Sequence, residues 1–224
     1  MLHDRAIRRI IAVGVAGMLL ASSLPAAAEE FSADIASTNA TAPSAAWLGQ
    51  LHVENDKVRF EKSDMPDGFF VSDTAAPAAF FVKPAPKVFM DANQTTQLTQ
   101  LLVPIDPNDP CRQWQTMAVL TGAADKGGQW VCERVGEETI DGRKATVYRA
   151  TSPTNRQNSA WIDPQLKFVL RIRTDDGTTI ELRNIQKGPQ VASLFEIPSN
   201  YRKFDPKLLI ERIKQSDVWV EPQH

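Results

Sequence analysis

The sequence predicts a mainly β protein in which roughly ten antiparallel strands form one strongly bent sheet, with few helices. Apolar and polar residues alternate with period two over most of the chain after residue 45. Short turns rich in Asp, Asn, Gly and Pro join these segments, and connections this short require antiparallel pairing. Residues 92–128 depart from the alternation and predict short helices instead.

Length and composition are sufficient for one globular domain of ordinary size, or at most two small ones, and we expect a single domain at residues 29–224. The chain has 224 residues, of which 42% are hydrophobic and 23% charged, with a formal net charge of -2. The apolar content is too high for disorder and too low for a protein with several membrane spans. A slightly acidic chain is not an electrostatic binder of nucleic acid, so we expect no nucleic-acid partner. We expect a monomer.

Residues 1–28 have the pattern of a secretory signal peptide. Three arginines precede an uncharged, mostly apolar stretch over residues 10–24, and Ala26-Ala27-Ala28 completes the small-residue cleavage pattern. The alternative is an uncleaved membrane anchor, but the stretch is short for a span of about 20 residues. We therefore expect cleavage after Ala28 and a periplasmic location.

Strands are expected wherever the alternation is clear. In residues 47–53 one face carries Trp47, Leu51 and Val53, and in residues 57–62 Val58 and Phe60 lie opposite Arg59. In residues 167–174 the pattern places Phe168, Leu170 and Ile172 on one face. The predicted strands are 47–53, 57–62, 69–72, 79–82, 87–90, 129–135, 143–151, 159–162, 167–174 and 178–186.

Two regions predict helix. Residues 92–128 carry leucines at near-helical spacing interrupted by prolines, which indicates a lid or plug of short helices. Near the C-terminus, Asp205 followed by Pro206 is typical of a helix start, and we expect this helix to reach about Ser216.

Cys111 and Cys132 are the two cysteines of the chain. In an exported protein an even number of cysteines indicates a disulfide. A metal-binding or redox pair is the alternative, but two ligands 21 residues apart without a nearby histidine make a poor zinc site. We expect a disulfide, no metal and no cofactor.

The sequence offers no convincing catalytic centre, so we do not expect an enzyme. It has no nucleophile elbow, phosphate-binding loop, dinucleotide fingerprint or zinc-protease motif. His52 lies within a predicted strand and is the one histidine between the signal peptide and the terminal residue. A hydrolase that uses His52 as its base is the remaining catalytic alternative.

Aromatic residues fall on most predicted strands, on both faces of the sheet. They pack in the core, or they line an apolar hollow that accepts a guest. Arg59 either forms an outward salt bridge with a neighbouring carboxylate or faces the hollow, where it could hold a lid carbonyl or an acidic ligand group. The candidate ligand-binding residues are Trp47, Leu51, Arg59, Phe60, Phe70, Phe81, Phe89, Tyr148 and Trp161.

Several short motifs occur in an order that resembles the half-barrel proteins of the periplasmic lipoprotein-carrier type (LolA and LolB) and their small secreted relatives. The motifs are Phe31-Ser32-Ala33-Asp34, Gly49-x-Leu51-x-Val53, Lys57-Val58-Arg59-Phe60-Glu61, Phe70-Val71-Ser72-Asp73, Ala160-Trp161-Ile162-Asp163 and Ser193-Leu194-Phe195-Glu196-Ile197-Pro198-Ser199-Asn200-Tyr201. Thr74 departs from the pattern, because it replaces the glycine of the family's S-D-G turn.

The resemblance implies a strongly curved, unclosed antiparallel half-barrel with a short helical lid over an apolar hollow, and a C-terminal helix. In the carrier the hollow holds the acyl chains of lipoproteins, and an arginine at the position of Arg59 bonds to the lid. We therefore expect a periplasmic carrier for a lipid or an acylated lipoprotein. The alternative is an envelope-stress or protein-interaction module with a filled core, whose contact with an envelope protein is the C-terminal helix and residues 218–220.

Overall fold

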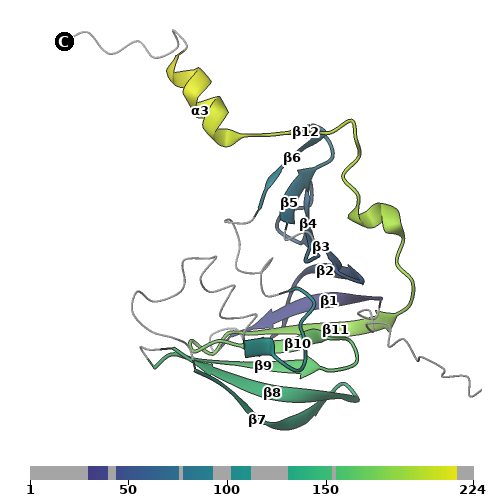
Figure 1. Cartoon of the computed structure of the whole chain (residues 1–224), viewed down its shortest axis with the longest axis vertical. Helices are drawn as coiled ribbons and strands as arrows, with labels where there is room; N and C mark the ends of the chain where they lie inside the picture. Colours follow the sequence, from purple (N-terminus) through teal and green to yellow (C-terminus); the bar gives the residue numbers. More distant parts are fainter. Residues whose placement is uncertain are drawn as a thin grey trace, which may run out of the picture.

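The protein is a mainly β structure built on one unclosed twelve-stranded sheet (Figure 1). The computed structural model describes residues 30–39, 44–75, 78–92, 102–111, 131–152 and 155–215. Its elements are β1 (Phe31–Thr38), β2 (Ala46–Glu54), β3 (Lys57–Lys62), β4 (Phe69–Asp73), β5 (Ala78–Lys83), β6 (Val88–Asp91), β7 (Val131–Ile140), β8 (Arg143–Thr151), β9 (Gln157–Asp163), β10 (Phe168–Arg173), β11 (Thr179–Lys187), the 3-10 helix η1 (Ala192–Phe195), β12 (Arg202–Lys203) and α3 (Pro206–Lys214).

Two series of antiparallel strands meet at the first strand of the chain. The sheet order is β12-β6-β5-β4-β3-β2-β1-β11-β10-β9-β8-β7, so β1 lies between β2 and β11. Strand β1 pairs with β11 from Phe31 opposite Lys187 to Thr38 opposite Thr179. We call β1 and β7–β11 the lower half-sheet, and β2–β6 with β12 the upper half-sheet.

The sheet bends so that the upper half-sheet rises from the lower one (Figure 1). Buried side chains from both halves form one cluster, which includes Val58 and Phe70 above and Val147 and Leu170 below. The Phe31 and Phe168 rings meet edge to face with centroids 5.4 Å apart. Because this cluster draws on one face of both halves, we call that face the inner face.

The outer face of the upper half-sheet is covered by residues 189–204, which we call the C-terminal strap. The strap contains η1 and then β12, which pairs in parallel with β6. Ile197 and Tyr201 of the strap pack against a second apolar cluster formed by Phe69, Val71 and Val82. The burial of this cluster explains why consecutive apolar residues such as those in β4 fill both sheet faces.

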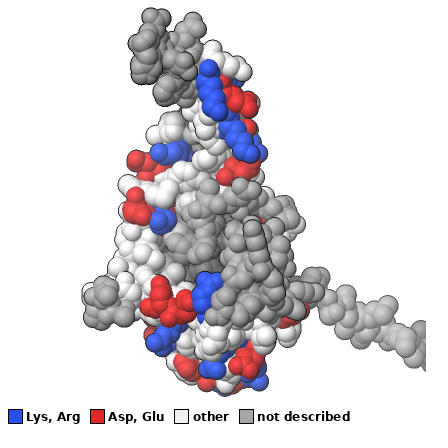
Figure 2. All heavy atoms as spheres, turned by 90° about the vertical axis from the view of Figure 1, so that its left-hand side faces the viewer, with Lys and Arg blue, Asp and Glu red and all other residues white. Residues whose placement is uncertain are grey.

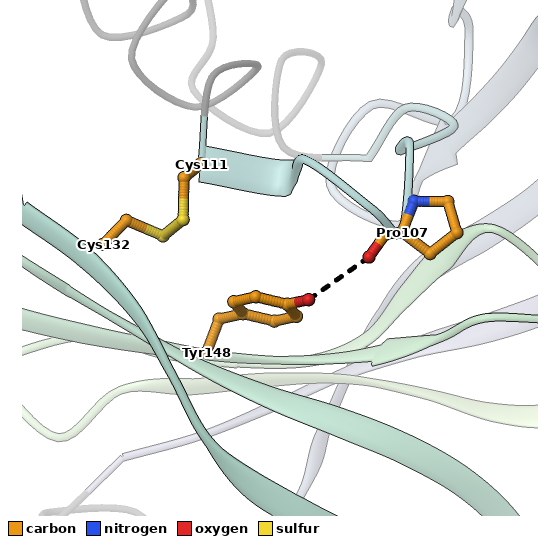
Figure 3. Close-up of a disulfide and its surroundings, with 4 residues drawn as sticks. All are labelled: Pro107, Cys111, Cys132 and Tyr148. Carbon is orange, nitrogen blue, oxygen red and sulfur yellow. Dashed lines mark hydrogen bonds between the residues drawn. A yellow bond between two sulfur atoms is a disulfide. The ribbon is translucent and has the colours of Figure 1, made fainter.

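The outer face of the lower half-sheet is covered by residues 103–111. Ile105 packs against Ile162, Val169 and their neighbours in a third cluster, and its N–H donates to the Lys167 carbonyl at 2.7 Å. The Tyr148 hydroxyl donates to the Pro107 carbonyl at 3.2 Å (Figure 3). A disulfide between Cys111 and Cys132 then ties this segment to β7, so the expected disulfide is confirmed.

Most predicted strands are present, and so is the C-terminal helix. The side chain of Asp205 accepts from the N–H groups of Lys207 at 2.9 Å and Leu208 at 3.4 Å, as expected for a helix cap. Strands β1 and β12 were not predicted from the alternation. The signal peptide and most of the expected lid at 92–128 lie outside the described residues.

Two predicted face assignments are wrong. Trp47 was placed with Leu51 and Val53, but the register of β2 against β1 shifts between Gly49 and Trp47, and Trp47 is 59% exposed. The alternation placed Ile172 with Phe168 and Leu170, but Ile172 packs with Val169 in the outer cluster. The register against β9 shifts between Val169 and Arg171, which is a β-bulge. An extra residue in one strand reverses the alternation beyond it, and this accounts for the error.

Candidate functional site

The candidate site is a row of apolar side chains that crosses the inner face from β1 to β6. Each residue of the row is the register partner of the next on the neighbouring strand. The row consists of Ala33, Leu51, Phe60, Phe70, Phe81 and Met90. Side chains opposite one another in adjacent strands lie on the same face, so antiparallel register alone aligns all six.

Burial decreases along this row toward the edge of the upper half-sheet. Leu51, Phe60 and Phe70 are 0%, 3% and 5% exposed, whereas Phe81 and Met90 are half-buried. Ring centroids are 6.2 Å apart between Phe60 and Phe70 and 4.9 Å apart between Phe70 and Phe81. The row, which we call the aromatic row after its three central phenylalanines, is therefore a continuous apolar surface that is buried in the core at one end and partly exposed at the other.

The backbone of Gly68 holds the accessible end of the row in place. A Cβ at this position would lie only 2.5 Å from Cζ of the Phe81 ring. The glycine therefore allows the ring to lie directly against the main chain before β4. A side chain at position 68 would therefore displace the Phe81 ring from its contact with Phe70.

Polar and charged side chains meet the inner face in the lower half-sheet. The Trp161 indole N–H donates to Glu138 at 2.7 Å, and Arg171 Nε donates to Glu181 at 2.6 Å. The Arg171 guanidinium lies 5.4 Å from the centroid of the Trp161 ring. Sequence reasoning missed these partners, since the bulge that brings Arg171 beside Trp161 has no marker in the local sequence.

Arg59 lies on the outer face, opposite the aromatic row. Its guanidinium donates from Nε to Glu61 at 2.8 Å and from one terminal nitrogen to the Leu194 carbonyl at 2.9 Å. The same group stacks 3.5 Å from the centroid of the Phe69 ring, and the side chain is 15% exposed. Of the two alternatives for Arg59, the structure has the salt bridge with a neighbouring carboxylate. The carbonyl that it holds belongs to the strap.

His52 lies beside Arg59 on the same outer face, since the two are register partners on β2 and β3. Its Nδ1 atom lies 2.9 Å from the side-chain oxygen of Gln190, a strap residue. The Gln190 amide nitrogen in turn donates to the Gly188 carbonyl at 2.9 Å. His52 and Arg59 therefore share one role in the structure, which is to attach the strap to the sheet.

The structure brings together five of the nine candidate ligand-binding residues on the inner face. These are Leu51, Phe60, Phe70, Phe81 and Trp161. The other four lie elsewhere. Trp47 is 59% exposed, Phe89 packs with the outer cluster under the strap, and Tyr148 packs with the outer cluster under residues 103–111. Arg59 is the fourth. Met90 and Ala33 belong to the row, although sequence reasoning did not select them.

An open polar depression of about 440 Å³ lies over β1, β2 and β11, and it is lined by Ser32, Asp34, Gln50, Asn184 and their neighbours. Asn184 donates to Asp34 at 2.7 Å within it.

In the described ranges, no three His, Cys, Asp or Glu side chains come together as a possible metal site. No helix in the described part of the chain is both long and apolar enough to cross a bilayer.

No protein-family model and no curated protein matches the chain. Three of the solved structures that it resembles in fold are distant. PNGF-II has 12% identity and a TM-score of 0.48 over 84% of this chain, which spans about a third (34%) of PNGF-II. MucB in complex with MucA(peri) has 13% identity and a TM-score of 0.42 over 76% of this chain and 55% of MucB. A Vibrio parahaemolyticus domain described as an outer membrane lipoprotein-sorting protein has 11% identity and a TM-score of 0.31 over 74% of this chain and 89% of that domain. Likeness at this level says nothing about ligand or activity.

Proposed function

We propose that this protein is an exported binding module, without catalytic activity, for an apolar ligand such as a lipid or the acyl chains of a lipoprotein. One observation carries the proposal: the aromatic row runs from the core to half-buried Phe81 and Met90 at the edge of the upper half-sheet. An acyl chain laid along such a row needs no polar motif. It gains about 0.8 kcal/mol for each methylene removed from water.

The energy of this contact suits reversible carriage. Ten buried methylenes contribute about 8 kcal/mol, and part of this is offset by the ordering of the chain. The resulting dissociation constant is micromolar or weaker. The expected signal peptide, with cleavage after Ala28, would deliver the protein to the periplasm, and the Cys111–Cys132 disulfide is typical of an oxidising compartment.

Two adjacent phenylalanines of β5 supply a matched test. Phe81 is on the inner face, whereas Phe80 is on the outer face with its ring 5.6 Å from that of Phe89. Binding of a dansylated undecanoic acid is followed by its fluorescence, with thermal unfolding as a check on folding. We expect Phe81→Asp to weaken binding at least tenfold and Phe80→Asp to leave it within twofold.

The proposal is wrong if folded Phe81→Asp protein binds the probe as well as the parent does, or if the parent does not bind it. A search for co-purifying lipid, by native mass spectrometry of protein from its own periplasm, gives a second measurement. Protein that is consistently empty of lipid, together with a stoichiometric envelope partner, would instead support the alternative of an interaction module with a filled core.

A further inference from the structure

Helix α3 carries the most concentrated exposed apolar surface in the described part of the chain. Leu208, Leu209 and Ile210 are 52%, 44% and 52% exposed, and Phe204 just before the helix is 38% exposed. The helix extends from the upper end of the molecule, at the opposite end from β7 (Figure 1). Exposed apolar residues gathered within seven positions mark an interaction surface rather than the usual scatter of single residues.

The charge of this segment is opposite to that of the whole protein. Residues 202–214 contain five Lys or Arg and two Asp or Glu, a net charge of +3, whereas the chain carries -2. Basic side chains run along the upper end of the molecule, where α3 lies, with acidic ones beside them (Figure 2). An anionic surface would therefore repel most of the protein and attract this end.

The arrangement around the helix axis places cations on both sides of the apolar surface. Successive residues are turned by about 100°, so Leu209 and Ile210 mark the two borders of one apolar sector, and Leu208 lies outside this sector, beyond Arg212. Around the helix axis, Lys207 and Lys214 are the next side chains beyond Ile210, and Arg212 is the next one beyond Leu209. Lysine and arginine at such borders reach the charged layer of a membrane while their aliphatic stems stay in the apolar layer.

The base of the helix is fixed to the upper half-sheet. Strand β12 pairs with β6 immediately before it, and the N–H of Phe204 donates to the Phe89 carbonyl at 2.7 Å. Lys203 forms an ion pair with Asp91 at 2.8 Å, and the Asp205 side chain caps the first turn. A preformed helix on a fixed base loses little conformational freedom on binding.

From these observations we infer that α3 docks the protein on an anionic lipid surface. The helix lies in the plane of the interface with Leu209 and Ile210 inserted and the basic side chains among the headgroups. The net charge of +3 over residues 202–214, with cations at both borders of the apolar sector, favours an anionic lipid surface as the occupant. The inference stands whatever ligand the inner face takes.

Sedimentation with vesicles tests the inference. The purified protein is mixed with vesicles of phosphatidylethanolamine and phosphatidylglycerol, or of phosphatidylcholine alone. We expect binding to the anionic vesicles that decreases with salt, and at least tenfold weaker binding to phosphatidylcholine. The double variant Leu209→Ser/Ile210→Ser should lose at least tenfold in affinity, and Lys207→Glu/Lys214→Glu should lose a similar factor.

Val131→Ser is the matched control, since Val131 is 66% exposed on β7 at the other end of the molecule. All variants share the same N-terminus, so a difference in vesicle binding between them is caused by the substituted residues of α3. Their thermal unfolding should match that of the parent because the replaced side chains are exposed. Equal vesicle binding by Leu209→Ser/Ile210→Ser, or no binding by the parent, would overturn the inference. So would a protein partner that binds the same residues in the absence of lipid.

Discussion

Replacing Arg59 by methionine should weaken the attachment of the C-terminal strap without touching the inner face. Methionine keeps an unbranched apolar side chain over Phe69 but removes the donors to Glu61 and to the Leu194 carbonyl. A hydrogen bond from a charged donor contributes about 1.5–3 kcal/mol, and an ion pair with a partner as exposed as Glu61 contributes about 0–1 kcal/mol. The expected loss in the free energy of unfolding is therefore about 2–3 kcal/mol.

The assays are urea unfolding and hydrogen exchange. A loss of this size lowers Tm by about 5–10 °C in a domain of this length. The amides of Arg202 and Phe204, which donate to the carbonyls of Lys87 and Phe89, should exchange faster, whereas those of β1 should not. The control is Arg149→Met, because Arg149 is 44% exposed and lies 3.8 Å from Glu133, so about 0.5 kcal/mol or less is expected. An Arg59→Met loss as small as that of the control, or unchanged exchange in the strap, would refute the role assigned to Arg59.

Three more outcomes follow from the described geometry. Gly49→Ala should lower the free energy of unfolding by more than about 2 kcal/mol in urea, because a Cβ there would overlap the Glu61 carbonyl; a smaller loss contradicts this. Reducing the disulfide should lower the free energy of unfolding by about 3 kcal/mol, and equal urea midpoints with and without reductant would disprove this prediction. Donation from the Thr174 hydroxyl, and then from Thr178, lowers the pKa of Asp176. The resulting stabilisation is complete above the pKa of Asp176 in the unfolded chain and is lost as pH falls through its pKa in the folded protein. The Tm of Asp176→Asn should therefore decrease less than the Tm of the parent when the pH is lowered from neutral to about pH 3. An equal decrease of Tm at low pH in the two proteins would contradict this prediction.

Much of the strand content could be predicted because alternation in a two-sided sheet depends on local sequence. Strand β1 was missed although Phe31, Ala33 and Ile35 alternate within it and all three are buried. Its intervening residues are Ser and Asp, which are uncommon in strands, and so the pattern looked weak. Strand β12 has only two residues, too few to show an alternation, and it forms through pairing with β6.

The candidate site was predictable in composition but not in arrangement. Alternation places Leu51 and Phe60 on one face of their hairpin, but the alignment of Phe60 with Phe70 and Phe81 depends on register across two further turns. Local sequence does not fix that register. The partner of Arg59 lies 135 residues away in the strap, so its role follows only from the folded topology.

The two outer clusters bear on where a guest could bind. Consecutive apolar residues put large side chains on both faces of this sheet, and exposed apolar surface of that size is costly in water. Each outer cluster is covered by a segment of the same chain, held above by Arg59 and below by the disulfide and Tyr148. The inner row, in contrast, remains half-buried at Phe81 and Met90. These two residues lie on β5 and β6, and β6 is the strand to which the base of α3 is fixed. An apolar ligand on the row and a lipid surface under α3 would therefore meet at the same end of the molecule, where a carried acyl chain could pass from one to the other.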